Sequence, residues 1–174
     1  MAGKPIISTK PFQGLRIEVD TLASFDEVLS RLRRLMGDAR VPEVVALAKV
    51  AMNEAEFAQK VEERFVGESG FTLFHEIDHG GWLPRFGIKR RSVRWILGNP
   101  LIAITMIRHD ITAGLFAPVE ILVTEKESGA GTTITYVLPS SLMVIEDTAS
   151  VECLSNSTGW LQNRWRQSPP VSTR

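Results

Sequence analysis

The strongest constraint on the fold of this chain is a pair of β-branched segments in its C-terminal half. Residues 119–125 (VEILVTE) and 132–138 (TTITYVL) are rich in valine, isoleucine and threonine, which favour β-strands. The residues between them (KESGAG) include two glycines, as is typical of a turn. This pattern predicts a β-hairpin, and the rest of the chain must supply further strands or helices to cover its apolar side chains.

The N-terminal part of the chain predicts one strand followed by one helix. Residues 13–19 alternate between apolar and polar side chains, which indicates a strand. The sequence Ser24–Glu27 has the form of a capping box, which is typical of a helix start. Apolar residues then follow at helical spacing as far as Gly37, and these are Phe25, Val28, Leu29, Leu32, Leu35 and Met36. We expect this helix to cover a sheet.

The middle of the chain predicts more helices and two more strands. Residues 41–66 are helix-forming in composition and contain two helix-start signals, so two short helices are expected. Residues 71–79 alternate with period two between flanking glycines and predict a central strand. Residues 91–98 predict another strand, and Asn99-Pro100 after it suits a turn into a short helix over 101–108.

This order of elements predicts an α+β fold. We expect a two-layer sandwich in which about five strands form an antiparallel sheet with the helices on one face. A flexible leader is expected over residues 1–12, and a single domain over 13–150 that includes the helical insertion at 41–66. Residues 151–174 are expected to form a weakly structured tail, with at most a short helix over 155–166.

The composition excludes several classes of partner and compartment. The chain has 20 basic and 20 acidic residues, so it lacks the excess positive charge of a nucleic-acid-binding or polybasic membrane protein. We therefore expect neither a nucleic acid nor a membrane as partner. Cys153 is the single cysteine, which excludes an intramolecular disulfide and suits a reducing compartment. Since no signal peptide or membrane-spanning segment is evident, the expected location is the cytoplasm.

Residues 75–79 (HEIDH) match the H-E-x-x-H pattern of zinc proteases. That pattern binds zinc on a helix, where the two histidines share one face. On the predicted strand, His75 and His79 are about 13 Å apart, too far to share one ion. We therefore expect no metal. No phosphate-binding glycine loop is present either, so no cofactor is expected.

The candidate site combines the end of the central strand with a basic segment. Residues 80–109 contain six arginines and lysines and no acidic residue. We predict that Arg91 and Arg94 bind a ligand together with Asp78 and Asn99, because arginines and a helix start both favour an anion. His79 is the candidate acid or base, since histidine titrates near neutral pH.

Two functions remain open at this stage. The first is the binding of a small molecule, an anion among the candidates, in a pocket near the central strand, with no catalysis established. The second is a homodimeric or protein-interaction module without catalytic activity, which is favoured by the absence of a convincing catalytic set. Whether the protein is an enzyme is therefore undecided.

Several of these segments together resemble the domain of unknown function 302 family. The resemblance lies in Gly70–Thr72 with Ile77–His79, in residues 96–100 and 117–123, and in Thr135-Tyr136. The HGGW turn and the run from Trp95 to Ala117 resemble the fungal-type branch of that family. The resemblance implies a TBP-like fold with one helix, a curved antiparallel sheet and a closing helix, commonly as a homodimer. It implies no established activity.

Overall fold

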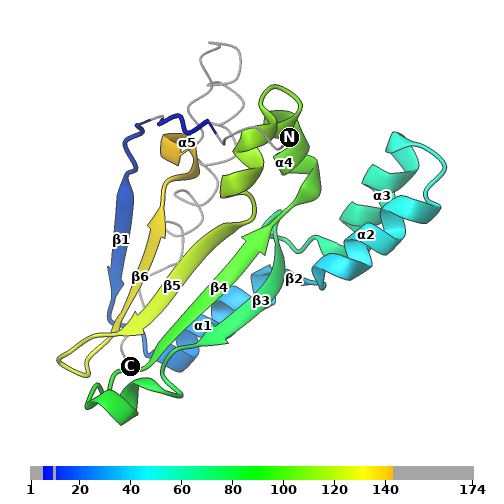
Figure 1. Cartoon of the computed structure of the whole chain (residues 1–174). Coiled ribbons are helices and arrows are strands. Elements are labelled where there is room, and N and C mark those ends of the chain that lie inside the picture. Colours follow the sequence, from blue (N-terminus) through cyan, green and yellow to red (C-terminus); the bar gives the residue numbers. More distant parts are fainter. Residues whose placement is uncertain (1–5, 10, 143–174) are drawn as a thin grey trace.

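The centre of the protein is an open sheet of six strands, which the computed structural model describes within residues 6–9 and 11–142 (Figure 1). The strands lie in the order β1 (Arg16–Thr21), β6 (Thr132–Val137), β5 (Val119–Glu125), β4 (Ser92–Gly98), β3 (Thr72–Asp78) and β2 (Gly37–Asp38). The first five pair antiparallel with their neighbours, whereas β2 pairs parallel with β3. The sheet is therefore mixed and six-stranded, and not purely antiparallel with about five strands.

The extra strand exists because two glycine-flanked segments approach each other closely. The Gly37 N–H donates to the Phe71 carbonyl at 2.9 Å, and the Ala39 N–H donates to the Leu73 carbonyl at 3.4 Å. A Cβ on Gly37 would overlap the carbonyl oxygen of Phe65, so only glycine fits at this crossing. A segment of two residues shows no periodicity, which is why the sequence pattern did not indicate it.

One face of the sheet is covered by α1 (Phe25–Leu35). The predicted capping box is present: the Ser24 Oγ accepts the Glu27 N–H, and the Glu27 carboxylate accepts the Ser24 N–H. The apolar side of α1 packs on buried residues of the four long central strands, among them Leu73, Trp95, Val123 and Tyr136. Burial of these side chains supplies the main driving force for folding.

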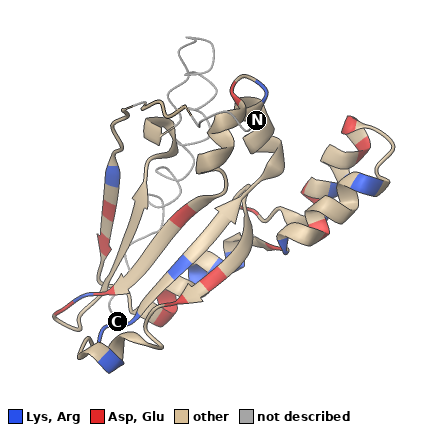
Figure 2. Cartoon of the chain, in the orientation of Figure 1, with Lys and Arg blue, Asp and Glu red and all other residues tan. Residues whose placement is uncertain are grey.

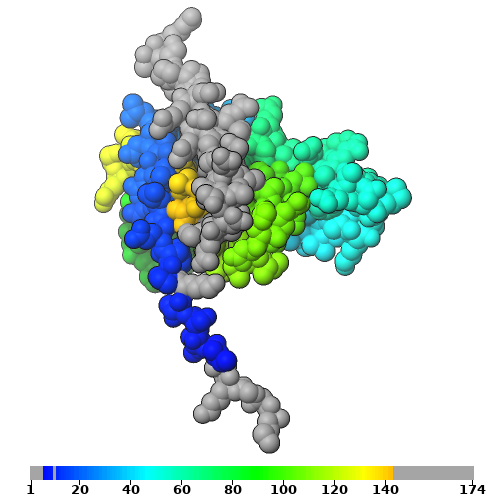
Figure 3. Space-filling model, turned by 90° about the horizontal axis from the view of Figure 1, so that it is seen from above, coloured from blue at the N-terminus to red at the C-terminus, as the bar shows by residue number. Residues whose placement is uncertain are grey.

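The predicted helical insertion forms α2 (Val41–Val50) and α3 (Glu54–Phe65). These helices have a small core of their own, made of Ala39, Leu47, Val61 and Phe65. Figures 1 and 3 show that the two helices project beyond the β3 side of the sheet, so they do not cover either face of it. We predicted that the helices cover one face of the sheet. Of α1, α2 and α3, only α1 does so.

The connection from β4 to β5 forms a helical cap at one end of the sheet. It consists of α4 (Pro100–Ile107) and η2 (Ile111–Phe116), followed by a cis peptide bond between Ala117 and Pro118. A short helix, α5 (Pro139–Leu142), follows β6 at the same end (Figure 1). At the opposite end, the turn after β3 contains η1 (Leu83–Phe86). The helix predicted over 155–166, the predicted tail and Cys153 lie outside the described residues.

Candidate functional site

The predicted site residues are spread along the whole length of β4. Arg91 immediately precedes the strand, Arg94 lies within it, and Asn99 immediately follows it. Eight residues of extended chain span about 26 Å, so Arg91 and Asn99 lie at opposite ends of the sheet. His79 and Asp78, at the end of β3, lie at the Arg91 end. The structure therefore does not bring the five residues into one pocket.

Arg91 and Asp78 both have partners within the fold. The Arg91 guanidinium donates two hydrogen bonds to the Asp26 carboxylate, at 2.8 and 2.6 Å, and lies 4.3 Å from the centre of the Phe25 ring. The hydrogen bond from Arg91 lowers the pKa of Asp26, and Asp26 in turn raises the pKa of Arg91. The Asp78 carboxylate accepts the Gly81 N–H at 3.1 Å and so fixes the turn after β3. Arg91 therefore links the start of β4 to α1, and Asp78 stabilises the turn after β3.

His79 and Arg94 share a concavity on the sheet face opposite α1. They line a broad, open trough of about 500 Å³ that also includes Trp82. The His79 and Trp82 rings pack edge to face with centroids 5.9 Å apart, and Arg94 forms an ion pair with Glu120. No described helix packs across this face of the sheet (Figure 1). Of the predicted set, this pair alone shares a concavity.

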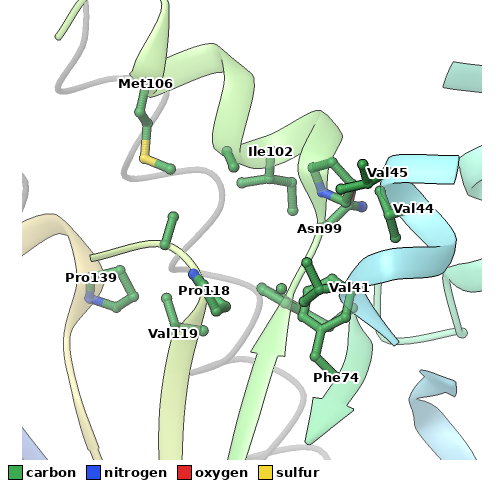
Figure 4. Close-up of a pocket in the computed structure, with 15 residues that line it drawn as sticks. Val41, Val44, Val45, Phe74, Asn99, Ile102, Met106, Pro118, Val119 and Pro139 are labelled. Atoms are coloured by element: carbon green, nitrogen blue, oxygen red, sulfur yellow. The ribbon is translucent and has the colours of Figure 1, made fainter. Parts of the chain in front are cut away.

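A second, more enclosed pocket lies at the other end of the sheet, between α2 and α4 (Figure 4). Its volume is about 220 Å³. Its walls come from α2, α4 and the ends of β3, β4 and β5, and their side chains are apolar except for that of Asn99. The lining residues are Val41, Val44, Val45, Phe71, Phe74, Gly98, Asn99, Pro100, Ile102, Ala103, Met106, Ala117, Pro118, Val119 and Pro139.

Local backbone features shape the floor of this pocket. The β3–β4 register shifts between Leu73 and His75, so Phe74 occupies an irregularity of the ladder, and its ring reaches the pocket. That ring lies directly over Gly98, because a Cβ there would be 2.7 Å from the Phe74 Cε2 atom. The absence of a side chain at Gly98 therefore leaves room for the Phe74 ring on the pocket floor (Figure 4).

Asn99 joins two elements at the pocket wall. Its side-chain oxygen accepts the Leu101 N–H at 2.8 Å and caps α4, while its amide nitrogen donates to the Gly70 carbonyl at 2.9 Å. The predicted helix start after Asn99 is thus confirmed, but the Asn99 side chain is already used for structure. The pocket therefore offers a ligand mainly apolar contact.

Sequence reasoning missed this pocket because its walls come from segments far apart in the chain. One signal was available: α4 (PLIAITMI) is apolar at every position except Thr105, and such a helix is normally buried on more than one face. Val41, Val44 and Val45 supply the facing wall from the insertion, whose position relative to α4 no sequence pattern indicates.

Comparison with known proteins assigns the chain to a family. Residues 47–157 match the family model described as domain of unknown function DUF302. The chain belongs to the DUF302 family. In a solved structure of an uncharacterized conserved DUF302 protein from Bacillus stearothermophilus, 16% of the aligned residues are identical and the TM-score is 0.57. The alignment covers 85% of this chain and 93% of that chain, which supports the shared fold. No curated protein matches the chain.

The family match starts within α2. Val41, Val44 and Val45 precede the matched residues, whereas the α4 wall of the pocket lies inside them. The pocket of this DUF302 protein is therefore built partly from family sequence and partly from the segment before it. Membership of the fungal-type branch stays a prediction.

The H-E-x-x-H residues lie on a strand, as predicted. His75 and Glu76 belong to β3, and His79 follows the strand end. Among the described residues, no group of three histidine, cysteine or carboxylate side chains is close enough to hold a metal ion. None of the described helices is long and apolar enough to cross a bilayer.

Proposed function

We propose that this DUF302 protein binds a small, uncharged, apolar molecule in the pocket between α2 and α4. The supporting observation is the pocket itself, a partly open cavity of about 220 Å³ with almost wholly apolar walls. A dry apolar cavity of about 150 Å³ is large enough to bind benzene. The pocket therefore suits an aromatic or branched aliphatic group somewhat larger than benzene.

The lining supports binding without catalysis at this pocket. None of its described residues carries a titratable side chain, so the pocket itself supplies no acid, base or nucleophile. The sequence suggested an anionic ligand because of Arg91 and Arg94. Both arginines already form ion pairs within the protein, Arg91 with Asp26 and Arg94 with Glu120. An uncharged ligand needs neither of them.

A binding titration with a pocket-filling variant tests the proposal. Calorimetry with toluene and with indole should detect saturable binding to the wild type. At a ligand concentration a hundred times Kd, the bound protein should gain about 2.7 kcal/mol of stability. Ala103→Phe fills the pocket from α4 and should abolish binding while the protein stays folded by circular dichroism.

The matched control is Ile104→Phe, which adds a ring at the next position of α4, where the side chain is 41% exposed and does not line the pocket. This variant should bind both probes like the wild type. Equal binding by Ala103→Phe and the wild type would refute the proposed location, and no binding of either probe by the wild type would refute the function.

Self-association is a second candidate, supported by the trough on the uncovered sheet face. Arg94 and Glu120 present both charge signs there beside the apolar side chains of Leu122 and Val137. A surface that carries both positive and negative charge can pair with the same surface of a second copy in a two-fold dimer. Light scattering over a range of protein concentrations tests for this dimer. A molecular mass that stays at the monomer value would rule out self-association.

A further inference from the structure

The loop over residues 80–91 lies at the end of the sheet opposite α4 (Figure 1). Here it is called the η1 loop. Several of its large apolar side chains are exposed. The exposed fractions of Trp82, Phe86 and Ile88 are 50%, 74% and 46%. Large apolar side chains gathered on one projecting turn are uncommon on a soluble surface and usually mark a contact site.

The η1 loop holds these side chains in a fixed arrangement. The Trp82 N–H donates to the His79 carbonyl at 3.2 Å, and the Ile88 N–H donates to the Leu83 carbonyl at 3.3 Å. Gly87, with a φ of 80°, closes the 3₁₀ turn in a conformation that suits glycine. The Trp82 and Phe86 rings then pack edge to face, with centroids 6.0 Å apart. Little conformational entropy remains to be lost when these rings meet a partner.

The same loop carries no acidic residue and four basic ones, Arg85, Lys89, Arg90 and Arg91, and Figure 2 shows blue segments of the chain at this end of the sheet. Arg85 and Lys89 are exposed and form no ion pair with any residue in the described ranges, while Arg90 donates to the Glu125 carbonyl. Three carboxylates lie near this loop: Asp26 is paired with Arg91, Asp78 accepts the Gly81 N–H, and Glu125 lies beside Arg90 and Arg91. The η1 loop is thus locally basic on a protein whose formal net charge is zero.

We propose that the η1 loop binds the surface of an anionic lipid bilayer. Indole and phenyl rings insert at the level of the headgroups and upper acyl chains, and lysine and arginine beside them pair with lipid phosphates. The expectation that no membrane partner exists rested on net charge, whereas lipid binding depends on the charge within a Debye length of the surface.

The shape of the loop favours a bilayer over an acidic protein. A stable protein interface needs about 800 Å² from each partner, which a single projecting turn does not supply. A fluid interface requires no matching surface and accepts a few inserted side chains. The inference goes beyond the proposed function, because none of the exposed η1 residues lines the pocket between α2 and α4.

Vesicle sedimentation tests the inference with the full chain. The wild type should sediment with vesicles of phosphatidylcholine mixed with phosphatidylserine, and much less with phosphatidylcholine alone. Arg85→Gln combined with Lys89→Gln should weaken binding roughly thirtyfold, since each cation near an anionic surface contributes roughly a fivefold factor. Trp82→Ser combined with Phe86→Ser should lose binding at every lipid concentration used.

The control removes apolar side chains that are even more exposed, at the other end of the molecule. Ile111 and Leu115 in η2 are 77% and 81% exposed, and Ile111→Ser combined with Leu115→Ser should bind vesicles like the wild type. The proposal fails if wild-type binding does not depend on phosphatidylserine, or if the Trp82 and Phe86 variant binds unchanged. Equal competition by soluble polyglutamate would instead indicate an acidic protein partner and would also overturn it.

Discussion

At the scale of single residues, surface carboxylates fix the ends of α1 and β1. Asp26 in the first turn of α1 is bound by Arg91, and Asp20 in β1 accepts from Thr133 at 2.6 Å and pairs with Lys126. The hydrogen bonds from these partners lower the pKa of both aspartates. Each carboxylate therefore binds its proton less tightly in the folded chain than in the unfolded chain.

This difference predicts how stability changes with pH. A carboxyl with a lowered folded-state pKa stabilises the fold above its unfolded pKa, and this contribution is lost as the pH falls through its folded pKa. The urea midpoint of the wild type should therefore drop as the pH falls below about 4. Asp26→Asn should lower the midpoint at neutral pH and reduce its fall in acid.

The control for this prediction is Glu127→Gln, at an exposed position of the hairpin turn without an ion pair to any described residue. Its urea midpoint should follow the wild-type pH profile. An Asp26→Asn variant with the wild-type profile would show that the Asp26–Arg91 pair contributes nothing to acid sensitivity.

At the scale of elements, the junction between α1, α3 and the sheet depends on glycine. Gly67 follows α3, and its N–H donates to the Phe71 carbonyl at 3.1 Å, the same oxygen that Gly37 uses. The two glycines therefore let the backbones of β2 and the α3 end pass at contact distance. A side chain at either Gly37 or Gly67 would overlap backbone atoms of the other segment.

Gly37→Ala should consequently destabilise the protein by roughly 1–3 kcal/mol or more, because the new methyl group overlaps the Phe65 carbonyl and must push β2 away from the end of α3. Urea denaturation measures the loss. Gly114→Ala in η2 is the matched control, since its Cβ would meet only the Ile107 Cδ1 atom, at 3.8 Å. A Gly37→Ala variant as stable as this control would contradict the described crossing.

The elements with clear periodicity were predicted from the sequence, and those without it were not. The hairpin of β5 and β6, the central strand β3, the following strand β4 and the capping box of α1 all lie within a few residues of their predicted positions. The first strand was expected over 13–19 but runs over Arg16–Thr21, because its alternation continues into the residues before α1. Strand β2 was missed because it forms only by pairing with β3.

The candidate site was less predictable than the fold, for a physical reason. Residue chemistry suggested Arg91, Arg94 and Asn99 as a group, yet each finds a partner inside the protein. The enclosed pocket depends on how α2 faces α4, and that arrangement follows from tertiary packing between segments more than forty residues apart. Local sequence patterns carry no information on such an arrangement.

At the scale of the whole molecule, the two ends of the sheet present different chemistry. The end capped by α4 encloses an apolar pocket, whereas the end with the η1 loop exposes aromatic and basic side chains (Figures 1 and 2). The trough with His79 and Arg94 lies on the uncovered face of the sheet. The pocket shares no lining residue with the trough or with the η1 loop, whereas Trp82 belongs to both the trough and the loop.

The location of a bound apolar molecule decides whether the pocket between α2 and α4 is its binding site. Methyl-resolved NMR during a titration with indole should shift the signals of Val44, Ile102 and Met106, which line the pocket between α2 and α4. The methyl signals of Leu122 and Val137, which line the trough, should stay in place. Shifts confined to Leu122 and Val137, with the pocket methyl signals unmoved, would show that indole binds in the trough and not in the pocket.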